Sequence, residues 1–192
     1  MTRYISILRG INVGGHKIIK MNDLRVSFEQ LGFSNTQSYI QSGNLIFNYP
    51  ETENQQLEKM ISNIILSTFG HEVPVLVLKL EEFKTMVKSN PFINDSSKNE
   101  AFFHLTFLAD VPETERVEYL LSFQYDPEEL IYHQQVIYLY CPNGYGNTKL
   151  SNNFIESKLK TTATTRNWKT VNELLSLSNK NNAQKSSDIQ LL

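Results

Sequence analysis

The first eighty residues carry a succession of strand and helix patterns, and their order restricts the fold more than any other feature of the chain. The segments lie over residues 3–9, 22–31, 36–41, 44–48, 53–69 and 73–80. The first alternates its apolar side chains between two faces, as strands do, whereas the second repeats them at helical spacing. The last is almost continuously apolar, which is typical of a strand buried on both faces. The resulting order, β-α-β-β-α-β, predicts a ferredoxin-like unit with both faces of its sheet covered.

The second half of the chain repeats most of this order. After a short connecting helix, the patterns predict strand, helix, hairpin and helix over residues 101–109, 113–122, 129–140 and 151–159. A last helix over 164–177, with Thr164 or Thr165 as its N-cap, leaves this half without a final strand. We therefore expect an α+β protein of two packed ferredoxin-like (βαββαβ) halves, the second incomplete, with a C-terminal helix.

These patterns also predict where the domains divide. The first ferredoxin-like half covers residues 1–80, and the second covers 81–177 with the connecting and C-terminal helices. Residues 178–192 turn to Ser, Asn, Lys and Gln, a composition that favours a disordered tail.

Composition points to an ordinary globular protein of the bacterial cytoplasm. Of 192 residues, 40% are hydrophobic and 20% charged, and no apolar run approaches the length of a membrane span. The N-terminus lacks the pattern of a signal peptide. The single cysteine, Cys141, cannot form an internal disulfide, and it ends an apolar run, so we expect a small packed residue there rather than a nucleophile.

Residues 9–20 join the first strand to the first helix and hold three glycines, an asparagine and a histidine. The pair Gly14-Gly15 indicates either a tight turn or a place where another group lies against the backbone. The helix that follows is expected to start at Asn22 as its N-cap. Helix N-termini attract anions through their free N–H groups. Three side chains of the loop add positive charge: Arg9, Lys17 and Lys20.

A plain connection is the competing interpretation of this loop. Its glycines match neither the G-x-x-x-x-G-K-[ST] phosphate loop nor the G-x-G-x-x-G dinucleotide fingerprint. Histidine side chains can transfer protons, but the sequence shows no partner for His16, and a surface histidine is the commoner case.

Charge is distributed unevenly along the chain. The net charge is −2, but residues 1–27 and 149–170 each carry +4, whereas residues 28–148 carry −10. The two cationic segments could converge on one surface, or each could be a solvated face.

Six motifs stand out along the chain, at residues 4–16, 20–24, 31–33, 39–44, 149–156 and 163–170, and among them the run Arg-Gly-Ile-Asn-Val-Gly-Gly at 9–15 is specific. Together they carry a resemblance to a family of uncharacterised bacterial proteins, domain-of-unknown-function family 1697. It implies two ferredoxin-like halves packed together and no established activity. It lends no catalytic residues, but it favours grouping the loop at 9–20 with the turn at 41–44 and the segment at 164–170.

The candidate ligand-binding residues come from these three segments. They are Arg9, Asn12, Gly14, Gly15, His16, Lys17, Lys20, Gln41, Asn44, Arg166, Asn167 and Trp168. The cations would hold the phosphates of a phosphorylated small molecule or of a nucleic acid, and Trp168 could stack on a base. No metal, cofactor or membrane partner is expected.

Two other function classes stay open. In a structural or protein-interaction domain without a ligand, Gln41, Asn44, Arg166 and Asn167 would satisfy backbone groups between the halves, and Trp168 would pack as core. An enzyme acting on a small anionic substrate would need a catalytic set, and the sequence shows none at diagnostic spacing.

Overall fold

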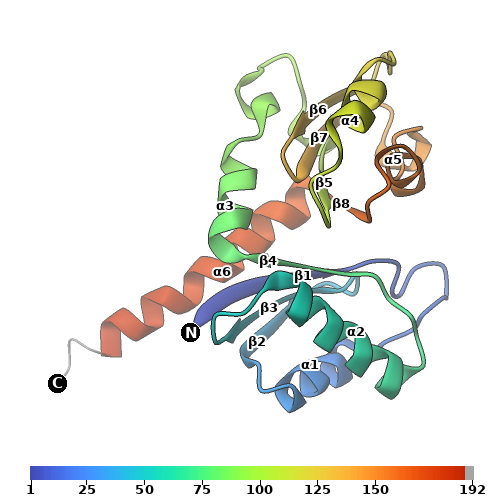
Figure 1. The fold of residues 1–192 in the computed structure, drawn as a ribbon. Helices are drawn as coiled ribbons and strands as arrows, with labels where there is room; N and C mark the ends of the chain where they lie inside the picture. Colours follow the sequence, from blue (N-terminus) through green and yellow to red (C-terminus); the bar gives the residue numbers. More distant parts are fainter. Residues whose placement is uncertain (189–192) are drawn as a thin grey trace. The chain divides into compact units, whose positions relative to one another are not determined.

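The computed structural model describes residues 1–188, of which 180–188 are described only as backbone helix. The chain divides into two compact units (Figure 1). Unit 1 comprises Met1–Thr85 together with the chain from Asn172, and unit 2 comprises Met86–Val171. None of the helices in this described part combines the length and apolar character that crossing a membrane requires.

Unit 1 is a four-stranded antiparallel sheet with two helices on one face (Figure 1). Its elements are β1 (Thr2–Leu8), α1 (Met21–Gln30), β2 (Ser34–Tyr39), β3 (Asn44–Tyr49), α2 (Asn54–Phe69) and β4 (Val75–Lys79), and α3 (Leu80–Lys88) follows. The strands lie in the order β2-β3-β1-β4, so β1 pairs with both β3 and β4. This is the order of a ferredoxin-like unit, which confirms the predicted fold class.

Both faces of this sheet are buried, as the apolar pattern predicts. Toward α1 and α2, Tyr4 of β1 stacks on Phe47 of β3 with ring centroids 5.6 Å apart, and Phe33 stacks on the same ring at 4.2 Å. The Tyr4 hydroxyl lies at the rim of this core and donates to the carbonyl of Thr52 at 3.0 Å. On the opposite face the side chains are also buried, namely Ile5, Ile7, Ile46, Leu76 and Leu78.

Unit 2 repeats the same sheet order. Its elements are β5 (Phe103–Leu108), α4 (Thr114–Leu121), β6 (Glu129–His133), β7 (Val136–Tyr140), α5 (Asn152–Leu159) and β8 (Ala163–Asn167), with short 3-10 turns at Pro91–Asn94, Glu100–Phe102 and Tyr145–Asn147. The strand order β6-β7-β5-β8 corresponds position by position to that of unit 1.

Strand β8 corrects the expectation that the second half is incomplete. Ala163–Asn167 pairs with β5, where Thr165 lies opposite Thr106. By residue type, Thr164 and Thr165 favour a helix start at this point, because threonine is a common N-cap. These β-branched residues instead extend the sheet, and the edge position tolerates the polar side chains. Asn167 caps the helix, since its Oδ1 accepts from the backbone N–H of Thr170 at 2.8 Å.

Helix α6 (Trp168–Asp188) continues past Ser178, where the composition predicts a disordered tail. The chain has no glycine or proline after Gly146 to end this helix. The rest of the predicted tail, residues 189–192, lies outside the described residues.

Candidate functional site

The predicted ligand-binding residues divide between the two units. Nine lie in unit 1, from Arg9 to Asn44, and three lie at the β8–α6 junction of unit 2, namely Arg166, Asn167 and Trp168.

The loop at 9–20 folds into a small two-residue hairpin. The backbone N–H of His16 donates to the carbonyl of Val13 at 3.0 Å, and that of Asn12 donates to Lys17 at 3.2 Å. Gly14 and Gly15, at the turn, have φ values of 58° and 79°. Two positive φ values in succession are characteristic of a type I′ turn, which favours glycine. The turn alone therefore accounts for the glycine pair.

Asn12 fixes this hairpin to the rest of unit 1. Its Oδ1 accepts from the backbone N–H of Ile19 at 2.8 Å. Its Nδ2 donates to the carbonyl of Ile19 at 2.9 Å and to that of Gln41 at 2.8 Å. The amide thus uses both of its donor hydrogens within the protein, and Gln41 contributes its backbone rather than its side chain. The loop is held in one conformation before any ligand arrives.

The turn at 41–44 supports the base of the same loop. The backbone N–H of Leu8 donates to the carbonyl of Gly43 at 2.8 Å. A Cβ on Gly43, whose φ is 78°, would lie 2.7 Å from Cβ of Leu8 and 2.9 Å from Cδ1 of Ile11. Asn44 is buried and its Nδ2 donates to the carbonyl of Tyr39 at 3.3 Å. Gly43 and Asn44 therefore serve the architecture of the turn.

The cationic groups of the loop have different surroundings. Lys17 Nζ donates to the backbone carbonyl of Glu72. Arg9 is half-buried, and its backbone N–H donates to the carbonyl of Pro74 at 3.0 Å. His16 and Lys20 are exposed, and no ion pair involves either of them among residues 1–179, whose side chains are described. These two side chains are the ones available to an external anion.

The N-cap position of helix α1 lies two residues earlier than expected, and it provides no side-chain cap. Lys20 occupies the N-cap position with φ −70° and ψ 126°, and no side chain accepts from the first turn. Asn22, predicted as the cap, lies inside the helix, where its Oδ1 accepts from Arg25 Nη2 at 2.8 Å. Lysine carries no acceptor, so it cannot take the role that Asn, Ser or Thr fills at this position. The first N–H groups of α1 thus lack the usual partner.

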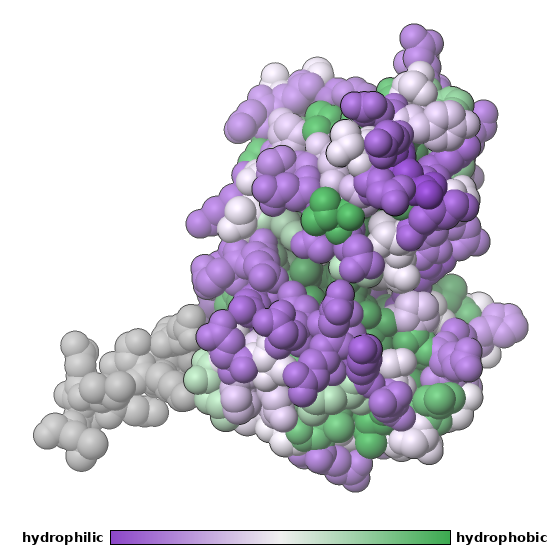
Figure 2. Space-filling view, in the orientation of Figure 1, coloured by the Kyte–Doolittle hydropathy of each residue, from purple (hydrophilic) through white to green (hydrophobic). Residues whose placement is uncertain are grey.

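Exposed aliphatic side chains surround the same loop. Val13, Ile18 and Ile40 are 60%, 59% and 49% exposed. Ile40 has a φ of 49°, a conformation that a β-branched residue rarely adopts. Figure 2 shows that hydrophilic side chains cover most of the face drawn there, with hydrophobic side chains gathered in patches between them. The loop therefore presents aliphatic groups as well as cations.

The three predicted residues of unit 2 have packing and capping roles. Trp168 is 9% exposed and meets Phe103 edge-on at 6.3 Å. Asn167 caps α6, as described above. Arg166 is half-buried, and its Nη1 donates to the carbonyl of Thr165 at 2.9 Å. Burial lowers its pKa to about 10, so the guanidinium keeps its charge at neutral pH.

A cluster of hydroxyl groups next to Arg166 is absent from the predicted set. Thr165 Oγ1 donates to Asn152 Oδ1 at 2.6 Å, accepts from the Tyr145 hydroxyl at 3.0 Å, and lies 2.7 Å from Thr106 Oγ1. These contacts fill the capacity of one hydroxyl. The four residues are far apart in sequence. The one signal in the sequence is that Thr106 and Thr165 lie opposite each other on β5 and β8, and it is visible only once β8 is recognised as a strand.

His104 extends this cluster. Its ring stacks on Tyr145 at 4.9 Å and 24°, and its Nδ1 lies 3.1 Å from the carbonyl of Phe102. A carbonyl accepts only, so Nδ1 carries the hydrogen. Burial lowers the pKa of His104, which favours the neutral ring. This agrees with the position of the histidine on a buried strand.

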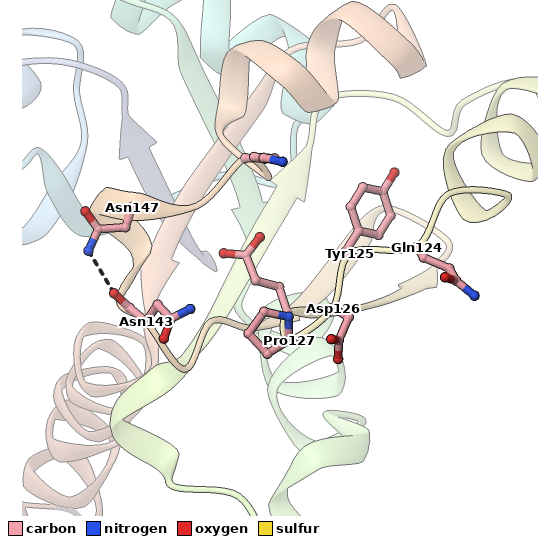
Figure 3. A pocket seen from close by; sticks show the side chains of 8 residues that line it. Gln124, Tyr125, Asp126, Pro127, Asn143 and Asn147 are labelled. Carbon is pink, nitrogen blue, oxygen red and sulfur yellow. Dashed lines mark hydrogen bonds between the residues drawn. The ribbon is translucent and has the colours of Figure 1, made fainter.

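Unit 2 also has a polar surface cavity of about 230 Å³ (Figure 3). It lies between the segment at 124–128 and the loop at 143–149, and Asn147 Nδ2 donates across this loop to the carbonyl of Asn143 at 2.9 Å. Asp126, Glu128 and Lys149 contribute charges of both signs. Within the part of the chain that is described, no three His, Cys, Asp or Glu side chains are grouped as a metal would require.

The sheet order and the folded loop are those of an α+β protein built from two ferredoxin-like units. The chain belongs to a family of proteins of unknown function, DUF1697, whose model matches residues 1–138. Its structure is similar to that of a conserved bacterial protein from Streptococcus pneumoniae, with a TM-score of 0.72 and 24% identity over 91% of this chain and 97% of that one. The latter similarity supports the fold alone. No curated protein matches the chain.

Proposed function

We propose that the protein binds a phosphate-bearing ligand, a phosphorylated small molecule or a nucleic acid, where loop 9–20 meets the start of α1. The observation that carries this proposal is the uncapped first turn of α1, which follows directly on the exposed Lys20.

Two physical effects act together at this point. A helix N-terminus carries about half a positive charge, and its unbonded N–H groups point away from the helix toward any ligand. Lys20 and His16 are exposed beside it, and neither has an ion pair among the described residues. Charge-assisted hydrogen bonds to phosphate are about twice as strong as neutral ones.

The fixed conformation of the loop adds to this case. Asn12 and the type I′ turn hold the loop in place, so a ligand would not have to order it. Binding to a preorganised site avoids the entropy cost of immobilising a flexible loop. In this proposal the glycines shape the loop, and the ligand contacts the helix start and the cations.

The backbone contribution can be tested with a matched pair of variants, Met21→Pro and Met21→Ala. Proline is tolerated at the first position of a helix, where it removes an N–H without breaking the helix. Lys20 already has the extended conformation that proline requires of its predecessor. Both variants lose the methionine side chain, but only the proline loses the donor. We expect about tenfold weaker phosphate binding in Met21→Pro than in Met21→Ala, measured by calorimetry.

The cation is tested in the same way with Lys20→Gln, for which Lys59→Gln, an exposed lysine of α2, is the control. Inorganic phosphate, a nucleotide and a short RNA serve as ligands. For a nucleic-acid ligand, the logarithm of the affinity should fall steeply with the logarithm of the salt concentration. In Lys20→Gln the slope of this plot should be shallower by about one unit. The proposal is wrong if none of the three ligands binds. It is also wrong if Met21→Pro binds as well as Met21→Ala and Lys20→Gln binds as well as Lys59→Gln.

Protein binding at the same loop is the second candidate, and the exposed Val13, Ile18 and Ile40 favour it. Isolated exposed aliphatics are common, but three of them belong to this loop and the adjoining turn, and exposed apolar groups that gather on a surface often mark a protein-binding site. Ile18→Ser would then reduce association with a protein partner and leave phosphate binding unchanged. Sedimentation analysis of the purified chain would show whether that partner is a second copy.

A further inference from the structure

Helix α5 places the ammonium group of Lys158 among three aromatic rings of unit 2. Lys158 Nζ lies 4.9 Å from the ring centre of Tyr119, 5.1 Å from Phe123 and 5.5 Å from Phe154. Each distance is within the range of a cation–π interaction, in which the negative face of a ring attracts a cation. Phe154 precedes Lys158 by four residues, so the two side chains share one face of the helix.

The rings are arranged as the walls of a cage. Tyr119 and Phe123 meet at an interplanar angle of 85° with their centres 4.9 Å apart. Tyr125 stands perpendicular to Phe154, at 84° and 6.2 Å, and supports it from the side. Tyr119 is 53% exposed and Phe123 is 41% exposed, so two of the walls can be reached from solvent.

The ammonium group has aromatic rings rather than carboxylates for partners. Lys158 forms no ion pair with any of the side chains that the structure describes, those of residues 1–179. The nearby Glu113 bonds instead to Arg116 Nε at 2.7 Å. Beside the rings lies a cavity of about 390 Å³, lined by Glu113, Glu115, Arg116, Tyr119, Ser157 and Lys158. A cation larger than an ammonium group thus has adjoining space.

We infer that Tyr119, Phe123 and Phe154 form a binding site for a quaternary ammonium group, and that Lys158 occupies this site as an internal competitor. A primary ammonium from outside would have no advantage over Lys158, which is held nearby by the chain. A quaternary ammonium group has no N–H groups to keep hydrated, and its methyl groups contact ring faces directly. Recognition of such cations by aromatic cages is an established use of cation–π interactions.

Competition by Lys158 sets the size of the effect. The apparent dissociation constant equals the intrinsic dissociation constant of the free cage divided by the fraction of time for which the cage is free. If Lys158 fills the cage about nine-tenths of the time, removing its charge tightens binding about tenfold.

The test compares the wild-type chain with Lys158→Met, which keeps an unbranched side chain, one atom shorter, and removes the charge. Both are titrated by calorimetry with choline, at constant ionic strength, and with dimethylbutanol, its neutral carbon isostere. We expect choline to bind Lys158→Met about tenfold more tightly than the wild type, and the isostere to bind neither measurably. Lys169→Met, which removes an exposed lysine of the same unit, should behave as the wild type does.

Two further variants keep the inference falsifiable if Lys158→Met is poorly folded. Lys158→Arg retains a cation that stacks on rings, so it should bind choline no better than the wild type. Phe123→Leu removes one wall and should weaken choline binding severalfold in either background. A folded Lys158→Met that binds choline no more tightly than the wild type would overturn the inference. So would unchanged binding in Phe123→Leu, because the rings would then be only a structural clamp for Lys158.

Discussion

The two units share one sheet order but place their long connections at opposite ends of it. In unit 1 the long connection follows β1 and covers residues 9–20, whereas the corresponding connection of unit 2 covers only 109–113. In unit 2 the long connection follows β7 and covers 141–151, against 50–53 in unit 1. Because β1 is antiparallel to β3, and β5 to β7, these connections leave opposite ends of the sheet. Similar sheets can therefore expose quite different surfaces.

The interiors under the helices differ as well. Unit 1 fills this layer with stacked rings, Tyr4, Phe33 and Phe47, which share one core with residues of α1 and of the sixteen-residue helix α2. Unit 2 has the eight-residue helix α5 in the same place and completes the layer with the hydroxyl cluster around Thr165. A shorter helix covers less apolar area, and a polar cluster is stable there only because its groups are bonded to one another. The comparison predicts that unit 1 is sensitive to changes of volume and unit 2 to the loss of a hydrogen-bonding group.

The largest effect should come from Gly43→Ala in unit 1. The new Cβ would lie 2.7 Å from that of Leu8, at a φ of 78° that alanine disfavours. Adding the cost of the left-handed backbone to that of overpacking gives a loss of about 3 kcal/mol in the free energy of unfolding, measured in urea. Gly70→Ala, which also has a positive φ but no heavy atom within 4 Å, should lose about 1 kcal/mol. Equal losses would contradict the close packing at the base of the loop.

A smaller loss, of about 2 kcal/mol, is expected for Thr165→Val in unit 2. Valine keeps the shape of threonine but leaves Tyr145, Asn152 and Thr106 without their shared partner. Thr162→Val, at an exposed position, should change the free energy of unfolding by less than about 0.5 kcal/mol. If the two variants are equally stable, the hydroxyl cluster does not contribute to the stability of unit 2.

The smallest effect should appear in the pH dependence of stability. Burial lowers the pKa of His104 in the folded protein, so the unfolded chain binds the proton more readily. The contribution of neutral His104 is complete above its ordinary pKa of about 6.5 and is lost as the pH falls through that value toward the lowered one. His104→Phe, which keeps a ring against Tyr145, should lose less stability than the wild type between pH 7 and pH 5. Parallel pH profiles would show that His104 titrates alike in both states.

Sequence periodicity was sufficient for most of the fold. Strands and helices with an apolar stripe, such as β1 and α2, were predicted because burial imposes their period. Strand β8 was missed because its threonines match a helix cap as well as a strand, and only its pairing with β5 decides between them. The start of α1 was misplaced for a related reason, since Asn22 is a good cap by type but its side chain accepts from Arg25.

The contacts within the candidate loop could not be predicted from the sequence. The glycines and cations marked the loop at 9–20, yet the amide contacts of Asn12 with Ile19 and Gln41 depend on how two distant turns meet. The roles of Gln41, Asn44 and Lys20 as ligand contacts stay predictions. The hydroxyl cluster and the ring cage of Lys158 join residues from several elements. Their contacts depend on how these elements pack, which the spacing of residues in the sequence does not predict.

The division of the chain has a consequence for synthesis. Unit 1 starts at the N-terminus but includes the chain from Asn172, where Leu174 is fully buried, and residues 86–171 intervene. Unit 2 is thus inserted within unit 1. The ribosome releases the N-terminal part first, so the sheet of unit 1 emerges early, unit 2 follows, and the last segment of unit 1 emerges after both. The unit that is begun first is therefore finished last.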